Sequence, residues 1–276
     1  MTGWRRSIGL AIVLVFAGCV GASGPRAEPV TVTPAPVPSD TPPTDRLPPG
    51  LADSGVVSPL ALAEAHTDLL RETVYRVRIE ERVDPAAGPS RRRILQGTFA
   101  NRTAYRFRIV RERGNDTALG SAFYADGDAL YERLIVDGRP RYYRPRSDLH
   151  AHAPYHQDPL GSPLQGQQLY VALEGTRPAF NTTQTADGEP LYVLRAEKAK
   201  DRRFLAAMGY LDRISAYEFR AVVTARGLVT AYRISYVATV DGERRRVVRT
   251  ARWSAVGNAT VRPPAWYGTA RNRTAP

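Results

Sequence analysis

Two segments of this chain alternate strictly between apolar and charged residues, and this alternation constrains the fold more than any other feature. The segments are "VYRVRIEER" and "AYRFRIVRER". Their apolar side chains are Tyr75, Val77 and Ile79 in the first segment and Tyr105, Phe107 and Ile109 in the second. The basic side chains between them include Arg76, Arg78, Arg106 and Arg108. Because successive side chains of a β-strand point to opposite sides of a sheet, both segments predict strands with one dry and one wet face, which is typical of antiparallel pairing.

Similar strand segments fill most of the chain and are separated by turns that contain glycine, such as Asp241-Gly242. Helical patterns interrupt them after Ser58, around "QGQQLYVALEG" and in "KAKDRRFLAAMGYLDR". The order is helix, strands, helix, strands, with about eleven strands and two or three helices. This order predicts an α+β domain in which one curved antiparallel β-sheet, a half-barrel, wraps its apolar face around the helices.

The first helix has the clearest start signal. Ser58 is a good N-cap residue, and Pro59 fits the first helical position. Apolar residues then recur at helical spacing at Leu62, Ala65 and Leu69. In the last of the three helices, the side chains expected to face inward are Phe204, Leu205 and Met208.

Cys19 is the only cysteine of the chain, and it follows a short segment with the three parts of an export signal. Arg5 and Arg6 form a basic start, and an apolar run ends in the small residues Ala17 and Gly18. The run is too short to cross a bilayer, which takes about 20 residues. Its small-small-Cys ending resembles the lipobox of bacterial and archaeal lipoproteins, which implies that Cys19 carries a lipid. An ordinary signal peptide with an incidental cysteine is the alternative, but it leaves a secreted protein with one unpaired cysteine.

The chain is therefore expected to have four parts. Residues 1–18 are a signal peptide, and residues 19–50 are the lipidated cysteine and an extended tether rich in Pro and Thr. Residues 51–262 form a single α+β half-barrel domain, and residues 263–276 form an irregular tail. The expected location is the cell membrane, with the domain lipid-anchored and facing the extracellular side.

The chain is strongly basic, with a formal net charge of +12. A basic exported protein is suited to anionic lipid headgroups or to acidic surface polymers. No nucleic-acid-binding motif is present, so no nucleic acid partner is expected. The hydrophobic content of 43% is enough to bury a core.

Several features together carry a resemblance to known proteins. The lipobox, the tether, the opening "PPGLADSGVVSPLALAEAHTDLLRETVYRVRIEE" and the closing "PPAWYG" resemble a family of haloarchaeal lipoproteins of unknown function, over most of the chain. The order of elements is also remotely similar to the half-barrel of the outer-membrane lipoprotein carrier and of mycobacterial lipid-binding lipoproteins. Those folds hold acyl chains between a curved sheet and helices, so the resemblance implies a carrier or binding module for a lipid or another hydrophobic ligand.

Residues with reactive or metal-binding side chains are few. No nucleophile motif, zinc-protease motif or phosphate-binding glycine loop is present, so no enzymatic activity, catalytic residue or cofactor is expected.

The loop "SDLHAHAPYHQD" combines imidazole and carboxylate groups, which suit a metal such as zinc, and a merely polar loop is the alternative. Its histidines are His150, His152 and His156. His66 is expected to be a surface or packing residue of the first helix. Candidate glycosylation sites are the sequon residues Asn101, Asn115, Asn181, Asn258 and Asn272.

The two faces of the alternating strands leave alternatives open. The apolar face forms either a solid core or part of a cavity for a hydrophobic ligand. The four arginines of the wet face form either an anionic-surface patch or a solvated face balanced by Glu80, Glu81 and Glu112. The leading functional hypothesis is a non-catalytic, membrane-anchored lipoprotein that binds or carries a lipid or other hydrophobic ligand. The alternative is a structural or sensory cell-envelope protein with a solid core that binds a protein or a surface polymer.

Overall fold

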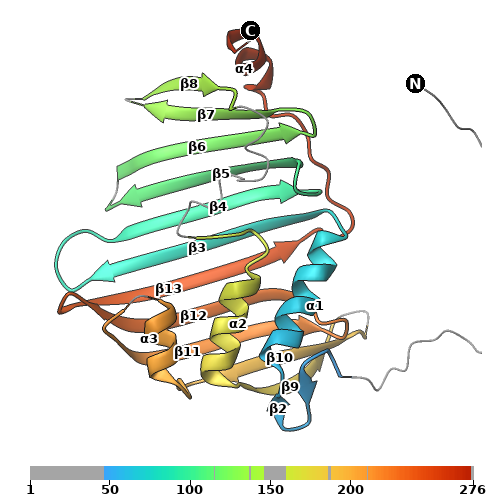
Figure 1. Cartoon of the computed structure of the whole chain (residues 1–276), viewed down its shortest axis with the longest axis vertical. Coiled ribbons are helices and arrows are strands. Elements are labelled where there is room, and N and C mark those ends of the chain that lie inside the picture. The colour runs from blue at the N-terminus through green and yellow to red at the C-terminus, as the bar shows by residue number, and fades with distance from the viewer. Residues whose placement is uncertain are drawn as a thin grey trace, which may run out of the picture. The chain divides into compact units, whose positions relative to one another are not determined.

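The main feature of the computed structural model is one antiparallel sheet of eleven strands (Figure 1). The model describes residues 47–114, 116–136, 138–145, 160–185, 188–209 and 211–274, which all belong to one compact unit, Asp45–Pro276. The sheet is curved and does not close, and helices α1, α2 and α3 cover one of its faces. The predicted α+β half-barrel is thus confirmed.

The helices and strands of the described residues have the following bounds. The helices are α1 (Pro59–Arg71), α2 (Gly166–Thr176), α3 (Arg202–Met208) and α4 (Tyr267–Arg273). The strands of the first half are β1 (Leu51–Ala52), β2 (Gly55–Val56), β3 (Tyr75–Pro85), β4 (Arg91–Phe99), β5 (Ala104–Arg113), β6 (Asp116–Asp126), β7 (Leu130–Val136) and β8 (Arg139–Tyr143). Those of the second half are β9 (Ala179–Gln184), β10 (Pro190–Ala196), β11 (Arg213–Thr224), β12 (Val229–Val240) and β13 (Glu243–Ser254).

The sheet consists of two meanders that meet at its centre. Its strand order is β8-β7-β6-β5-β4-β3-β13-β12-β11-β10-β9, and β1 pairs with β2 in a separate small ribbon. Strands β3 to β8 pair with their neighbours in sequence, and so do β9 to β13. The single long-range pairing joins β3 to β13, with Ile79 opposite Ala251. At the turn after β12, Asp241 and Gly242 both have positive φ, as a tight two-residue hairpin turn requires.

The alternating strands place their apolar residues on the face that the three helices cover, which we call the inner face. The opposite face is the outer face. Tyr75, Phe99 and Phe107 belong to a group of buried, closely spaced rings on the inner face. Gly97 lies opposite Phe107, and a Cβ atom at Gly97 would lie 2.4 Å from the Cβ atom of Phe107. Glycine is therefore the residue that lets this large ring lie directly against β4.

Helix α1 begins as predicted, but its buried stripe is displaced by one residue. Ser58 is the N-cap, and its hydroxyl accepts a hydrogen bond of 3.3 Å from the amide of Ala61. The residues buried on the sheet are Leu62, His66 and Leu70, whereas Ala65 and Leu69 are half-buried. The stripe still follows the helical period, and His66 lies within it where the prediction had placed Ala65 one residue earlier.

One prediction about helix α3 was met in part, and one about the tail was wrong. In α3, Leu205 is buried, whereas Met208, the last residue of the helix, faces the same side but is 40% exposed. The tail 263–276 was expected to be irregular, and α4 lies within it. Ala270 of this helix is fully buried in a small second core on the outer face, against tyrosines of β6 and β7. Packing thus stabilises a helix too short to show a periodic pattern in the sequence.

Candidate functional site

The six apolar residues that were candidates for a ligand site form part of the solid core instead. Tyr75, Val77, Ile79, Tyr105, Phe107 and Ile109 are all between 0% and 5% exposed. Tyr75 alone among them borders a cavity on the inner side. This cavity has a volume of about 620 Å³, and Phe99, Leu70 and Leu164 also line it. The others pack against rings and aliphatic side chains of neighbouring strands. Apart from the cavity beside Tyr75, a hydrophobic ligand on the inner face therefore has to contact residues other than these six.

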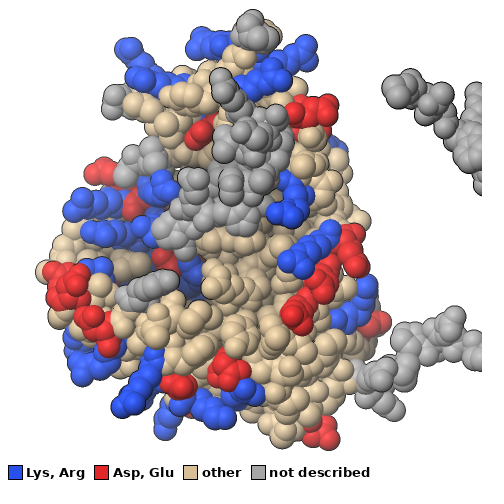
Figure 2. Space-filling view, viewed as in Figure 1, with Lys and Arg blue, Asp and Glu red and all other residues tan. Residues whose placement is uncertain are grey.

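Another cavity lies between the sheet and helices α2 and α3, and we call it the inner pocket. It has a volume of about 580 Å³. Its walls are mainly apolar, and they come from β3, β11, β12, β13 and the two helices. The apolar lining residues are Val83, Val171, Leu205, Met208, Leu211, Ile214, Tyr217, Ile234, Tyr236, Ala238, Val240 and Val247. Figure 2 shows an uncharged area at the centre of this side of the molecule, with charged side chains around it.

Charged side chains line one part of this apolar pocket. Glu81 of β3 and Arg249 of β13 lie opposite each other in the sheet, with an Nη2–Oε2 distance of 3.0 Å. Their side chains are only 14% and 13% exposed. Arg93 approaches the other carboxylate oxygen of Glu81 at 3.8 Å. The expectation that Glu81 belongs to the solvated face was wrong, because it shares the parity of Val77 and Ile79 along β3 and so points inward.

Two tyrosines line the pocket together with this ion pair, and their hydroxyl groups add polar atoms to its apolar walls. The rings of Tyr217 and Tyr236 stack with their centroids 5.7 Å apart. Burial raises the pKa of Tyr236 to about 12 and that of Tyr217 further still. Both phenols therefore stay neutral at ordinary pH and can donate hydrogen bonds. The sequence reasoning missed these residues, although their alternation along β11 and β12 is a usable signal.

A polar network inside the core fixes the start of α2, the helix that forms one wall of the pocket. His66 is fully buried, and its Nε2 lies 3.0 Å from the carbonyl oxygen of Leu164, while its Nδ1 accepts a hydrogen bond of 3.2 Å from the amide of Val229. These partners assign the neutral imidazole with its proton on Nε2. Trp253 donates its indole N–H to the carbonyl oxygen of Pro163 at 3.1 Å. His66 is thus a packing residue, one of the two roles expected for it.

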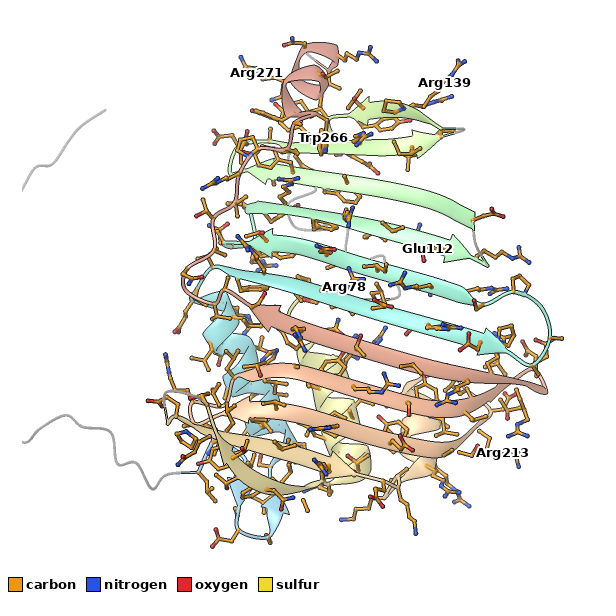
Figure 3. The ribbon with its side chains drawn as sticks, turned by 180° about the vertical axis from the view of Figure 1, so that it is seen from behind. Arg78, Glu112, Arg139, Arg213, Trp266 and Arg271 are labelled. Carbon is orange, nitrogen blue, oxygen red and sulfur yellow. The ribbon has the colours of Figure 1, made fainter. Side chains whose placement is uncertain are left out.

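The four arginines of the predicted anionic-surface patch lie together on the outer face (Figure 3, where Arg78 is labelled). Arg76 and Arg106 flank Thr98 across the sheet, and Arg78 and Arg108 flank Gln96. Arg78 and Arg108 both donate to the Oε1 atom of Gln96, at 2.9 Å and 3.4 Å. The proximity that the patch requires is therefore present.

The acidic neighbours of this patch pair mainly with another arginine. Glu80 and Glu112 both bind Arg92, with N–O distances of 2.7 Å and 3.1 Å, and Glu80 also binds Arg78 at 2.9 Å. The hydrogen bond from Arg92 lowers the pKa of Glu80, against a smaller opposing effect of burial. Glu80 therefore stays ionised and balances part of the positive charge of the arginine patch.

Several predicted sites fall outside the described residues or remain predictions. Cys19, the histidines His150, His152 and His156, and Asn115 lie outside the described residues. Asn101, Asn181, Asn258 and Asn272 are exposed. Within the described ranges, no group of three or more His, Cys, Asp or Glu residues is arranged to hold a metal ion. In the same ranges, no helix has the length and apolar character that crossing a membrane takes.

The fold and the inner pocket define an α+β half-barrel with a cavity between its sheet and its helices. The chain belongs to the family of unknown function DUF7537, whose model matches residues 6–270. The predicted membership in a family of unknown function is thereby confirmed. No curated protein is significantly similar to the chain in sequence.

Two solved structures are remotely similar to this fold. LprF from Mycobacterium bovis is 10% identical, with a TM-score of 0.38, over 77% of this chain and 99% of the other. The LolA superfamily protein NE2245 from Nitrosomonas europaea is 12% identical, with a TM-score of 0.29, over 76% of this chain and 97% of the other. With TM-scores below 0.5, neither likeness carries a function over to this chain.

Proposed function

We propose that this chain is a membrane-anchored extracytoplasmic lipoprotein, without catalytic activity, whose domain binds or carries a lipid or other hydrophobic ligand. The observation that supports this proposal is the inner pocket. Its volume of about 580 Å³ falls within the range of small-molecule sites, which is roughly 300–1,000 Å³. Its lining, mostly aliphatic and aromatic with a few polar groups, is also typical of such sites.

The arrangement of polar groups favours an amphipathic ligand. The aliphatic walls, such as Val171, Ile234 and Val247, suit an acyl chain. Gln167 and Gln168 of α2 and Arg245 of β13 also line the pocket and can bind a polar headgroup. The Glu81–Arg249 pair is already satisfied internally, so it contributes a polar boundary rather than an unpaired charge.

Filling the inner pocket is expected to weaken ligand binding strongly. In the Val171→Trp variant, an indole replaces a half-buried side chain on the pocket wall. Because the indole occupies space that the ligand needs, the affinity for a dansyl-labelled fatty acid should fall by about tenfold or more. Fluorescence titration of the purified full-length chain measures this affinity.

The matched control is Leu60→Trp, which adds an indole to α1 at a position that is 53% exposed and does not line the pocket. This variant should bind the probe as the unmodified chain does. Equal binding by all three proteins, with melting temperatures that show both variants folded, would refute the inner pocket as the ligand site.

The membrane anchor is tested separately through Cys19. The Cys19→Ser variant cannot form the thioether that attaches a lipid, and stable anchoring generally takes more than one acyl chain or signal. We therefore expect the variant to appear in the medium or the soluble fraction, whereas the unmodified chain sediments with membranes. Cell fractionation followed by detection of the protein measures this, and a variant that still sediments like an integral protein contradicts the anchor.

The alternative function is a structural or sensory envelope protein with a solid core. The observation that favours it is the burial of all six residues that were first expected to contact a ligand. Native mass spectrometry of the purified chain separates the two functions. A co-purified lipid that Val171→Trp removes supports the carrier, and a chain without bound lipid or probe affinity supports the structural protein.

A further inference from the structure

The outer face carries a groove whose lining includes six arginines and, among the described residues, no acidic side chain. The groove has a volume of about 690 Å³. Its basic residues are Arg76, Arg78, Arg106, Arg108, Arg133 and Arg252. We call it the outer groove. It lies on the side of the sheet opposite the inner pocket (Figure 3).

The sheet register explains why these arginines come together. Arg252, Arg78, Gln96 and Arg108 stand side by side on the four neighbouring strands β13, β3, β4 and β5. The row continues through Ala122 to Arg133 of β7. A second row places Ser254, Arg76, Thr98 and Arg106 beside it on the same four strands. Two arginine rows are thus held in parallel by backbone pairing.

Much of this charge is not balanced locally. Within the described part of the chain, Arg76, Arg106 and Arg252 form no ion pair, and all three are exposed. The Nε atom of Arg133 is buried and has no hydrogen-bond partner there. Of the groove arginines, Arg78 is the one whose guanidinium pairs with a carboxylate of the described residues, that of Glu80. An anion bound in the groove would supply the missing partners.

The basic surface extends beyond the groove in both directions. A hollow of about 610 Å³ shares Arg78 and Arg252 with it and adds Arg220 and Arg233. Another, of about 380 Å³, shares Arg76 and Arg106 and adds Arg262. From β7 to β11 the sheet has seven strand spacings, which at about 4.8 Å each span roughly 34 Å. Such a band suits an elongated anion with many charges rather than a single ion.

We propose that the outer groove binds an extended anionic polysaccharide. Guanidinium groups pair bidentately with carboxylate or sulfate groups, and the side chains of Thr98, Ser254 and Asn258 can bond sugar hydroxyls. The indole of Trp266, which lines the groove, offers an apolar surface for a sugar ring. The floor is recessed, so it admits a single chain more readily than it contacts the plane of a bilayer surface.

This proposal is tested by measuring the affinity of the full-length chain, purified in detergent, for fluorescein-labelled hyaluronan oligosaccharides. The groove variant combines Arg76→Gln, Arg106→Gln and Arg252→Gln. Because it removes three charge-assisted contacts, it should bind the oligosaccharides at least about tenfold more weakly. The single variants Arg106→Gln and Arg252→Gln give a second measure that does not depend on the stability of the triple variant. Labelled neutral dextran of similar length should not bind.

A matched control removes the same charge elsewhere. It combines Arg202→Gln, Arg203→Gln and Arg213→Gln, three exposed arginines that do not line the groove. Its affinity should stay within about twofold of the unmodified chain, since isolated surface charges contribute little. Equal weakening in both triple variants would show charge attraction without a site and overturn the proposal. So would absent binding at physiological salt, or a groove-dependent preference for vesicles of anionic lipid or for single-stranded DNA. Loss of binding in the Val171→Trp variant instead would assign the polysaccharide to the inner pocket.

Discussion

Replacing Glu81 by alanine is expected to lower the free energy of unfolding by about 3 kcal/mol, because it leaves the guanidinium of Arg249 in an apolar surrounding without its main partner. The two side chains are 14% and 13% exposed and lie 3.0 Å apart. A buried charge keeps its desolvation cost after its counter-ion is removed, so breaking such a pair costs more than the pair itself contributes. Chemical denaturation of the unmodified chain and the Glu81→Ala variant measures the difference.

The neighbouring residue provides the matched control. Glu80 also pairs with two arginines, but on the outer face, where its side chain is 27% exposed. Glu80→Ala should therefore cost about 1 kcal/mol or less. Replacing both partners inside, with Glu81→Leu and Arg249→Met, should restore most of the lost stability. Equal losses at the two glutamates would contradict the assignment of Glu81 to a dry environment.

The second large effect is acid sensitivity caused by His66. Burial lowers the pKa of His66 from 6.5 to about 4. In the neutral ring, Nδ1 accepts a hydrogen bond from the amide of Val229. Protonation would place a hydrogen on Nδ1, so that two donors would face each other. Between these two pKa values the unfolded chain binds a proton that the folded chain does not, so stability falls as the pH falls. The His66 contribution lost between pH 6.5 and pH 4 is about 3 kcal/mol.

The effect is read as a difference between two proteins. The His66→Gln variant cannot titrate, so its unfolding free energy should depend less steeply on pH in this window than that of the unmodified chain. Denaturation curves at the two ends of the window give both slopes, and titrating carboxylates affect both proteins alike. Parallel slopes would mean that His66 is not held neutral in the core.

The parts of the fold that depend on local sequence could be predicted. Period-two alternation gave the strands and their faces, because neighbouring side chains on a strand necessarily point in opposite directions. Glycine turns such as Asp241-Gly242 gave the hairpins, since positive φ at both positions limits the residues allowed. The start of α1 followed from Ser58 and Pro59 for the same local reason.

The parts that depend on distant contacts could not be predicted. Arg252 joins the arginine rows only because β13 pairs with β3, and no local pattern encodes that pairing. The period of the strand turns Glu81 inward, but a charged residue beside two other charges suggests solvent, and its counter-ion Arg249 lies on a strand distant in sequence. The inner pocket depends on how α2 and α3 lie on the sheet, so the alternating pattern named residues of β3 and β5 that do not line it, although other residues of β3 do. Helix α4 has no periodic pattern that predicts it, and it is stabilised by the packing of Ala270 against tyrosines of β6 and β7.

The pairing of β3 with β13 also bears on the order in which this chain can fold. It joins residues 160 to 178 positions apart, from Pro85 with Arg245 to Arg76 with Ser254, whereas every other pairing in the sheet links strands adjacent in sequence. Each meander is local and can form soon after its strands are synthesised, but the junction has the largest loop-closure cost and requires the last strand. Until β13 is complete, β3 and β12 each present an unpaired edge, the arginine rows lack Arg252, and the Glu81–Arg249 pair cannot form. The middle of the finished sheet is thus the last part to assemble, and an incomplete chain carries two exposed strand edges open to pairing with other chains.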